Sequence, residues 1–402
     1  RKSNLNSDRK PADSRHYLRL NVLAEVIASY DGKQPLHRYL ASFFKSNPGF
    51  GSSDRKLYRR WIYAWFRLGK LASQLDFNKR VLVAYYLVNG LNDELSLFLN
   101  ASSGFQFPIE DLSLRERIGI VHTALGLKDL DGIFPFQSQL SSGMDRILLA
   151  ESILSQPDVF IRVKRGFESK VQNELNVKNI SFEKTDLVNC WKLPAATNLQ
   201  ELKSFAVGYF EVQDYGSQAI ADLVPAHKYE SWWDVCCGAG GKTLYLTDKF
   251  PGIKLHCTDK RESILVNLKE RVTRGKYRGI TYSVLDAAID IPNTAKFNGV
   301  LVDAPCSGSG TRSRNPENLV FFDEAQLTEY SKTQSTILSN VSRSVPSGSY
   351  LVYMTCSVFA LENENVVSLF IQDSEYQLVV QKMVVGYQHG SDSLYVAVLR
   401  KK

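Results

Sequence analysis

The spacing of hydrophobic and polar residues divides the chain into three parts, and the first, residues 1–150, has a helical pattern. Apolar residues recur every three or four positions in "RHYLRLNVLAEVIASY", "SSDRKLYRRWIYAWFRLGK" and "SLRERIGIVHTALGL", which begin at residues 15, 52 and 113. This spacing places the apolar side chains on one face of a helix. We therefore predict an all-helical domain for this part of the chain.

The predicted helix over residues 52–70 carries an aromatic and a basic set of side chains. Its N-cap is expected at Ser52 or Ser53. The stripe that we expect in the core consists of Tyr58, Trp61, Trp65 and Leu68. The basic set lies on another side of the helix and consists of Lys56, Arg60 and Arg67, with Arg55 and Arg59 close by. These cations either hold phosphate groups or solvate the helix, and the pattern leaves both alternatives open.

The second part, residues 151–210, changes to short strand-like runs. "DVFIRVKRG" predicts a strand and "FESKVQNELNVKN" a helix, while "ISFEKTDLVNCWKLP" predicts one or two strands and "FAVGYFEVQD" a further one. This order predicts a small α/β unit that ends near residue 210.

The third part, residues 211–402, alternates strands with helices. Five β-like runs, "SWWDVCC", "IKLHCTD", "ITYSVLD", "NGVLVDAP" and "GSYLVYMTC", begin at residues 231, 253, 280, 298 and 348. Helix-like stretches separate most of them, which predicts a parallel sheet with helices on both faces. Residues 378–402 instead predict two strands around a turn at 389–392, so one edge of the sheet is expected to be antiparallel.

Length and composition agree with this division. A chain of 402 residues exceeds one ordinary core, so two or three domains are expected. The longest apolar run, Val81 to Val88, is far shorter than a membrane span of about 20 residues, and the polar start lacks a signal-peptide core. None of the six cysteines forms a C-x-x-C pair, and the adjacent Cys236 and Cys237 suit neither a zinc site nor a usual disulfide. We expect reduced thiols, no metal and a cytoplasmic location.

Charge is unevenly distributed along the chain. Residues 1–80 hold 17 Lys and Arg against 6 Asp and Glu, a formal charge of +11, whereas the remainder holds 32 against 36, or −4. A strongly basic N-terminal part followed by a near-neutral remainder suggests a polyanionic partner, although a solvated helical face would explain the charge equally well.

A glycine-rich loop, "DVCCGAGGKT" from Asp234 to Thr243, follows the first strand of the third part and opens a helix. A Walker phosphate loop would need glycine where Cys236 stands, and the dinucleotide fingerprint G-x-G-x-x-G fails at Thr243. The loop is therefore interpreted as a tight turn that lets the backbone approach a ligand closely.

Two acids narrow the choice of that ligand. Asp259 ends the second strand, where an acid suits the hydroxyls of a ribose. Asp286 ends the third strand and is placed to accept a hydrogen bond from an adenine amino group. A ribose and an adenine without a phosphate clamp favour S-adenosylmethionine over ATP or NAD, although each Asp alone could simply cap the next helix.

Two cysteines follow the fourth and fifth strands, Cys306 in "DAPCSGSGTRSRNPE" and Cys356 in "YMTCS". Two thiols and the acid Asp303 at one sheet edge suit methylation of a pyrimidine at C5, in which a thiolate adds to C6 and makes C5 nucleophilic. Asp303 is placed to stabilise the adduct, and Arg312 and Arg314 are expected to grip the substrate backbone. The first stretch alone favours Cys306 as the nucleophile.

Several stretches together resemble the RNA cytosine-C5 methyltransferases, specifically the bacterial ribosomal RNA group called Sun or Fmu. The matching stretches, which occur in the family's order over residues 211–402, are "EVQDYGSQ", "DVCCGAGGKT", "DAPCSGSGTRSRNPE", "YMTCSVFALENE" and "HGSDSLYVAVLRK". The resemblance implies a Rossmann-like class I S-adenosylmethionine-dependent methyltransferase domain at 211–402. It also implies a helical RNA-binding domain similar to the antitermination factor NusB at 1–150 and an RNA-recognition-like unit at 151–210.

The resemblance also implies residue roles. The cysteine of the family's T-C-S pattern is the nucleophile and falls on Cys356, whereas the P-C cysteine assists product release and falls on Cys306. Lys242 matches a lysine close to the active site. The cofactor pocket falls on Cys236, Cys237, Gly238, Ala239, Gly240, Gly241, Lys242, Asp259, Asp286 and Asp303. The family's Ala-Ala-Pro is replaced by Cys237-Gly238-Ala239, which loosens the turn.

The resemblance implies methylation of cytosine in folded ribosomal RNA, with 16S RNA favoured. Because C5 and C6 must be reached, a flipped or single-stranded cytosine is expected. We expect the protein to be a monomer. The alternatives are methylation of transfer RNA, a DNA cytosine-C5 methyltransferase that uses Cys306 as nucleophile, an RNA-binding assembly factor without catalysis, and an ATP-binding protein.

Overall fold

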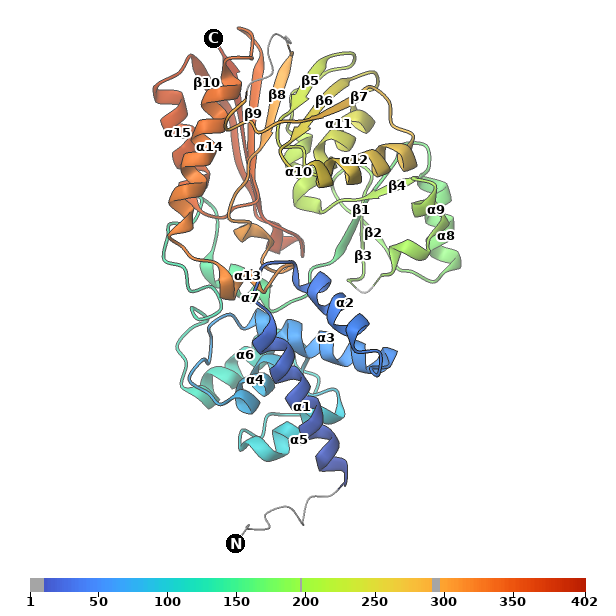
Figure 1. The fold of residues 1–402 in the computed structure, drawn as a ribbon, viewed down its shortest axis with the longest axis vertical. Helices are drawn as coiled ribbons and strands as arrows, with labels where there is room; N and C mark the ends of the chain where they lie inside the picture. The colour runs from blue at the N-terminus through green and yellow to red at the C-terminus, as the bar shows by residue number, and fades with distance from the viewer. Residues whose placement is uncertain (1–10, 196, 291–296) are drawn as a thin grey trace. The chain divides into compact units, whose positions relative to one another are not determined.

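The computed structural model describes residues 11–195, 197–290 and 297–402, which pack into two compact units (Figure 1). Of the described residues, 11–136, 146–155 and 315–322 form the helical unit. The sheet unit consists of the described residues within 137–145, 156–314 and 323–402. No helix in the described ranges is long and apolar enough to cross a membrane.

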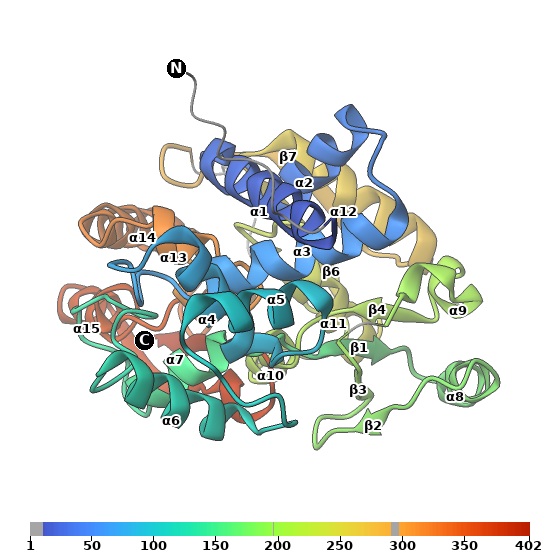
Figure 2. The ribbon, with the colours of Figure 1, turned by 90° about the horizontal axis from the view of Figure 1, so that it is seen from below.

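The helical unit has the all-α structure that the spacing predicts (Figure 2). Trp61 of α3 is 1% exposed and stacks on Tyr85 of α4 with ring centroids 3.8 Å apart, so the aromatic stripe is core as expected. The helices of this unit are α1 (Pro11–Ser29), α2 (Leu36–Ser46), α3 (Ser52–Arg67), α4 (Phe77–Asn89), α5 (Glu94–Ser103), α6 (Leu114–Leu125), α7 (Arg146–Ile153) and α13 (Asn318–Phe321).

Two predictions for α3 are wrong. The N-cap is Gly51, whose backbone is extended, and no side chain caps the helix there. Arg67 is only 4% exposed and donates to the carbonyls of Ile153 and Ser155, so it ties α3 to the chain around α7. Lys56 and Arg60 are exposed, as expected of a basic face.

The short segment Asn315–Phe322 joins the helical unit although it follows Cys306 in sequence. The ring of Phe321 packs on Tyr30 with a centroid separation of 5.4 Å and faces Phe66 at 6.4 Å. Buried Glu317 accepts the backbone N–H of Leu36 at the start of α2 over 3.1 Å. This segment therefore supplies both core packing and a helix cap to the helical unit.

The sheet unit is built on seven strands in the order β10-β11-β9-β8-β5-β6-β7. Strands β9, β8, β5, β6 and β7 pair in parallel, and β11 pairs antiparallel with both β9 and β10, so the predicted parallel sheet with an antiparallel edge is confirmed. The strands are β5 (Ser231–Asp234), β6 (Lys254–Asp259), β7 (Ile280–Val284), β8 (Gly299–Asp303), β9 (Tyr350–Thr355), β10 (Tyr376–Val384) and β11 (Leu394–Lys401).

Helices cover both faces of this sheet (Figure 1). One core joins Leu255 and Val352 of the strands to Leu244 and Leu268 of the helices, and a second core on the opposite face contains Leu338. The first face is covered by α10 (Tyr215–Asp222), α11 (Gly241–Lys249) and α12 (Glu262–Gly275), and the second by α14 (Gln326–Ser342) and α15 (Glu364–Gln372). The alternating strands thus form the expected layered α/β architecture.

Residues 156–212 form a separate four-stranded sheet in the order β2-β3-β1-β4, and one of its faces has its own core. The opposite face is buried as well, because Phe160 and Cys190, 2% and 0% exposed, pack with Ile220 of α10 and Leu244 of α11. RNA-recognition domains stack bases on an open face of their sheet. In this small sheet, the face that packs on α10 and α11 is buried and cannot stack bases. The elements are β1 (Val159–Val163), α8 (Glu168–Val177), β2 (Glu183–Lys184), β3 (Cys190–Leu193), α9 (Lys203–Ala206) and β4 (Phe210–Val212).

Candidate active site

The carboxyl ends of four parallel strands meet at one edge of the large sheet. The strand register places Asp234 of β5 beside Cys257 of β6 and Leu301 of β8, and it places Asp303 of β8 beside Met354 of β9. The predicted loop, acids and thiols follow these strand ends. Ligands bind at this edge in open α/β sheets, so the residues assigned separately from sequence belong to one site.

The glycine loop between β5 and α11 needs glycine at two positions. Gly238 and Gly240 have φ values of 54° and 80° in the left-handed region. A Cβ on Gly240 would lie 2.3 Å from Leu268 Cδ1, whereas one on Gly238 would meet no atom within 4 Å. Gly240 is therefore fixed by packing against α12, while the backbone at Gly238 is open to a ligand.

Buried polar contacts fix the start of this loop. Thr243 donates to Asp234 over 2.6 Å, and burial raises the pKa of Asp234 to about 7. Burial also raises the pKa of Cys236, so this thiol stays protonated near neutral pH. These contacts lie at the buried base of the loop, below its glycines.

The second acid, Asp259, holds the loop from β6. Its Oδ2 accepts the N–H of Gly238 over 3.0 Å, and Arg261 donates to both carboxylate oxygens. Although burial opposes ionisation, the hydrogen bonds from Arg261 hold the pKa of Asp259 below its ordinary value. Asp259 is therefore a carboxylate beside the glycine turn, which suits an acceptor for ribose hydroxyls.

Asp286 follows β7 and is partly exposed. Its Oδ1 accepts the N–H of Ala288 over 3.1 Å and so closes a local turn after the strand. This local contact is of the kind expected if Asp286 only caps the backbone that follows it. The contact of Asp286 with an adenine amino group therefore stays a prediction.

Lys242, in the first turn of α11, forms an ion pair with Asp303 at the end of β8. Their Nζ and Oδ2 atoms are 2.6 Å apart, and the Lys242 side chain is only 11% exposed. Burial alone would lower the pKa of Lys242, but the charge and hydrogen bond of Asp303 raise it above its ordinary value. The pair links the glycine loop to the strand that precedes Cys306.

The two candidate thiols lie side by side. The Sγ atoms of Cys306 and Cys356 are 3.3 Å apart, and both residues are partly accessible. The hydrogen bond to Cys356 and burial raise the pKa of Cys306 well above its ordinary value. Cys306 therefore stays a thiol that can donate a proton, which leaves Cys356 as the better candidate for nucleophilic attack.

The expectation that Arg312 grips a substrate backbone is wrong, because the residue is 2% exposed and donates to the carbonyl of Ser307 over 3.1 Å. Arg314 forms ion pairs with both Asp214 and Asp392. Both arginines thus serve the architecture of the loop after Cys306, since their donors are directed to the protein itself.

Sequence inspection missed the residues that support the site from a distance. Arg271 of α12 donates to the carbonyl of Ala239 over 2.8 Å and to buried Glu211 over 3.0 Å, which steadies the turn where the family has proline. Glu362 accepts hydrogen bonds from the loops of both cysteines. The only local signal for Glu362 is its place in the quoted stretch "YMTCSVFALENE".

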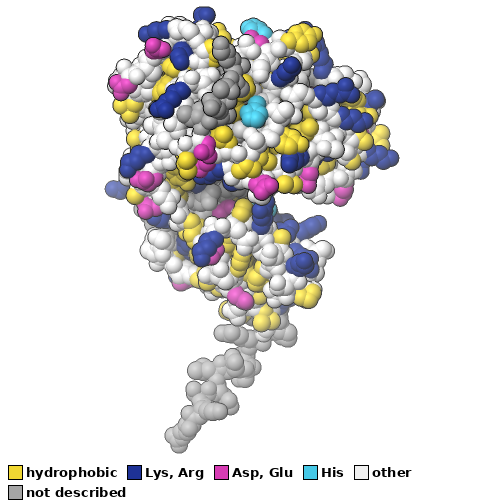
Figure 3. Space-filling view, turned by 45° about the horizontal axis from the view of Figure 1, so that its top comes forward, with side chains coloured by type: hydrophobic (Ala, Val, Ile, Leu, Met, Phe, Trp, Pro, Cys, Tyr) yellow, Lys and Arg dark blue, Asp and Glu magenta, His cyan; other side chains and the backbone are white. Residues whose placement is uncertain are grey.

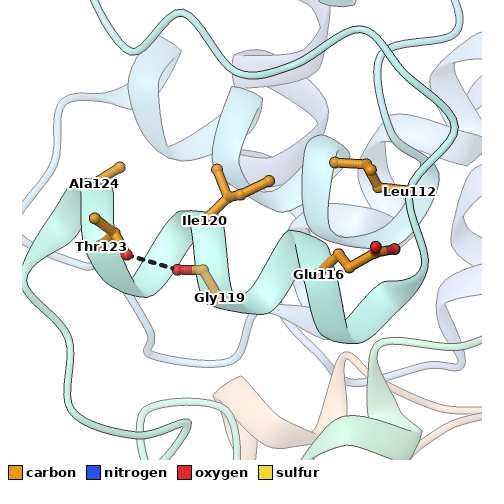
Figure 4. A pocket seen from close by; sticks show the side chains of 6 residues that line it. All are labelled: Leu112, Glu116, Gly119, Ile120, Thr123 and Ala124. Atoms are coloured by element: carbon orange, nitrogen blue, oxygen red, sulfur yellow. Dashed lines mark hydrogen bonds between the residues drawn. The ribbon is translucent and has the colours of Figure 1, made fainter.

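A shallow pocket of about 580 Å³ on α6 of the helical unit offers no comparable chemistry (Figure 4). Its lining consists of Leu112, Glu116, Gly119, Ile120, Thr123 and Ala124. Its one ionisable side chain, Glu116, accepts the N–H of Ser113 over 2.7 Å as part of a capping box. The pocket is therefore a groove along one helix face.

The layered sheet, with its glycine loop after β5 and acids at successive strand ends, defines the Rossmann-like fold of the class I S-adenosylmethionine-dependent methyltransferases. Within this class, residues 221–399 match the family described as 16S rRNA methyltransferase RsmB/F. The predicted resemblance is confirmed for these residues, which are similar to the RsmB/F proteins.

Individual relatives agree with this placement. Ribosomal RNA small subunit methyltransferase B of Proteus mirabilis is 28% identical over 264 residues, which cover 63% of this chain and 62% of that protein. The aligned part thus spans less than two thirds of the curated relative.

Two solved structures share the fold at low sequence identity. The crystal structure of PH0851 is 20% identical, with a TM-score of 0.70, and covers 98% of this chain and 100% of its own. NSun6 from Pyrococcus horikoshii, solved with SFG, is 17% identical, with a TM-score of 0.57, and covers 63% of this chain and 93% of its own. At these identities the likeness concerns the fold alone.

Proposed function

We propose that this chain methylates C5 of a cytosine in RNA, with 16S ribosomal RNA as the substrate and S-adenosylmethionine as the methyl donor. The observation that carries the proposal is the pair of thiols 3.3 Å apart at neighbouring strand ends, beside the ion pair of Lys242 and Asp303. The names of the matched family and of the Proteus protein support ribosomal RNA as the substrate class.

The residues present fit S-adenosylmethionine. Asp259 is an ionised acceptor for the ribose hydroxyls, and the open backbone at Gly238 permits close approach of the ligand. Asp286 is assigned to the adenine amino group, and the remaining contacts are assigned to residues 236–242 and Asp303. When bound, this cofactor supplies an electrophilic methyl group.

The chain's own residues carry out the covalent chemistry on the base. Cys356, as thiolate, adds to C6 of cytosine, which makes C5 nucleophilic. Asp303 accepts a hydrogen bond from the exocyclic amine, while the positive charge of Lys242 offsets the negative charge that develops on the ring. A base or solvent takes the C5 proton, the C–H electron pair re-forms the C5–C6 double bond, and the Cys356–C6 bond breaks. Cys306 assists this release by donating a proton to the departing Cys356 sulfur.

We propose residues 1–150 as the RNA-binding domain, since residues 1–80 carry the excess positive charge and Lys56 and Arg60 are exposed on α3. The sheet unit also exposes cations around α12, among them Lys260, Lys269 and Lys276. Figure 3 shows Lys and Arg side chains along the right edge of the view and further ones at its upper left. Because the face of the small sheet is buried, RNA contacts are assigned to these charged surfaces. We retain the predictions of a monomer and a cytoplasmic location.

The deciding experiment combines purified protein with labelled S-adenosylmethionine and separate 16S RNA, transfer RNA and DNA substrates. Bisulfite sequencing of RNA from cells with and without the gene then locates the modified cytosine. We expect methylation of 16S RNA and none of DNA. Methylation of transfer RNA alone would mean that transfer RNA, and not 16S RNA, is the substrate. RNA binding without methyl transfer would support the alternative of an RNA-binding assembly factor without catalysis.

A further inference from the structure

A single buried carboxylate lies beneath both cysteine turns. Glu362 is 0% exposed and ends the short 3-10 helix Ala360–Glu362, which follows β9. An ionisable side chain in such a place is costly to bury unless hydrogen bonds compensate for its lost water. Its partners therefore indicate what it contributes.

Glu362 accepts hydrogen bonds from three segments. Its Oε1 accepts the N–H of Ser307 over 2.8 Å and Gln334 Nε2 of α14 over 3.1 Å. Its Oε2 accepts the hydroxyl of Ser307 over 2.6 Å and the hydroxyl of Ser357. Ser307 and Ser357 directly follow Cys306 and Cys356, so one carboxylate joins the two thiol-bearing turns to each other and to a helix.

Neighbouring contacts close the same junction. The N–H of Gly310 donates to the carbonyl of Cys356 over 2.8 Å, and Asn363 donates to the carbonyl of Ser357 over 2.9 Å. A Cβ on Gly310 would lie 1.9 Å from the carbonyl oxygen of Ser393, so glycine is required for this approach. The separation of the two sulfurs is thus fixed by packing and hydrogen bonds behind the site.

We infer that Glu362 is a positioning residue that sets the distance between the two thiols and thereby couples attack at C6 to product release. The inference rests on the proposed function for its meaning in catalysis. Attack and release use different sulfurs on different loops, so both sulfurs must face the same base. A carboxylate bonded to both loops supplies that constraint without contacting substrate.

The first test measures thiol proximity without RNA. Oxidised glutathione converts the two thiols to a disulfide and is itself reduced to two molecules of glutathione, and mass spectrometry follows the rate. Glu362→Ala should slow formation of the Cys306–Cys356 disulfide at least ~10-fold, because the turns lose their common acceptor. Glu362→Gln, which keeps the shape and one carbonyl acceptor, should stay within about threefold of the wild type.

The matched control is Glu364→Gln, two residues further on, because Glu364 bonds to Ser141 and Ser142 instead of the cysteine turns. It should leave the rate unchanged. If Glu362→Ala does not fold, the double variant Ser307→Ala/Ser357→Ala removes the two hydroxyl contacts and should slow the disulfide about fivefold. Wild-type rates in the folded Ala variant, or in the double variant, would overturn the inference.

The second test uses methyl transfer. Glu362→Ala should lower kcat about 100-fold while KM for S-adenosylmethionine stays within about twofold, and Glu362→Gln should recover most of the rate. An equal loss in both variants, or a rise in KM alone, would contradict a positioning role. A wild-type chain that methylates nothing would refute the proposed function, whereas the disulfide rates would still decide the role of Glu362.

Discussion

The carboxyl-terminal edge of the large sheet has two halves, after β5 and β6 and after β8 and β9, which are stabilised in different ways. On the β5–β6 half, the glycine loop is held by its backbone geometry and by a few local contacts, among them the N–H of Gly238 to Asp259 and Arg271 to the carbonyl of Ala239. On the β8–β9 half, the turns after Cys306 and Cys356 are joined by hydrogen bonds between residues about 50 positions apart, including Ser307 to Glu362. The first half leaves open backbone for a ligand, whereas the second fixes two reactive atoms.

This difference corresponds to the chemistry assigned to each half. A bound cofactor supplies its own contacts and orders a small loop, so a glycine turn and an acid are sufficient. Two thiols that act in sequence on one base need a fixed separation before the substrate arrives. Substitutions should therefore change affinity in the first half and the rates of individual steps in the second.

The largest effect is expected from Cys356→Ala, which removes the proposed nucleophile. Methyl transfer should fall at least ~1,000-fold, and no covalent complex should form on RNA that contains 5-fluorocytosine. Denaturing gel electrophoresis of the protein–RNA complex checks this result. Retention of the covalent complex would mean that Cys306 attacks the base, as the stretch "DAPCSGSG" alone suggests.

Cys306→Ala should impair release and leave attack intact, because the remaining thiol is the nucleophile. We expect this variant to attack and methylate RNA that contains ordinary cytosine and then to accumulate as a covalent complex with the methylated RNA, while multiple-turnover methylation falls about 100-fold. A single-turnover assay beside a steady-state assay separates the two steps. Equal losses in both assays, with no trapped RNA, would assign this cysteine to attack as well.

Asp303→Asn should break the ion pair with Lys242 at the boundary between the two halves. Because the pair stabilises charge on the ring, the rate of methylation should fall about 100-fold with a smaller change in cofactor affinity. Rapid-quench kinetics and cofactor titration measure the two quantities. A change in affinity for S-adenosylmethionine, with no change in the rate, would mean that Asp303 serves cofactor binding only.

Asp259→Ala should act on the cofactor half alone. The loss of a charged hydrogen-bond acceptor for the ribose should raise the Kd for S-adenosylmethionine about 10- to 100-fold. The rate of disulfide formation between Cys306 and Cys356 should not change, which makes it the internal control. Isothermal titration calorimetry gives the Kd, and an unchanged value would remove Asp259 from the cofactor pocket.

The smallest effect is expected on the pH dependence of stability, through Asp392, which pairs with Arg314 in the loop after Cys306. Burial and the nearby charge of Asp214 raise the pKa of Asp392 to about 7, despite the opposing charge of Arg314. A carboxyl with a raised folded pKa contributes stability that is complete below its ordinary pKa of 3.8 and is lost as the pH rises through about 7.

Asp392→Asn should therefore flatten the decline in Tm between about pH 4 and pH 7, with a difference of a few degrees from the wild type. The exposed Asp373→Asn is the control and should keep the wild-type pH profile. Parallel pH profiles of the wild type and Asp392→Asn would contradict this assignment.

Local patterns were sufficient for the strand ends but not for the contacts behind them. The β5 loop, Asp259 and the two cysteine turns follow from short apolar runs that end in small or polar residues, and the structure places them at one edge. The roles of Arg312 and Arg67 were misjudged because an arginine in a basic stretch looks exposed, whereas both donate to buried carbonyls. Glu362 could not be assigned because its partners Ser307 and Gln334 are distant in sequence.

The segment Asn315–Phe322 also bears on how this protein can be divided. The chain leaves the helical unit, builds most of the sheet unit, and then returns after Arg314 to place Phe321 against Tyr30 and Phe66. A single cut therefore cannot separate the two units into complete pieces. A fragment that begins after residue 155 would carry an orphaned apolar helix that begins twelve residues after Cys306, so loss or exchange of the helical unit requires a simultaneous change in the catalytic loop.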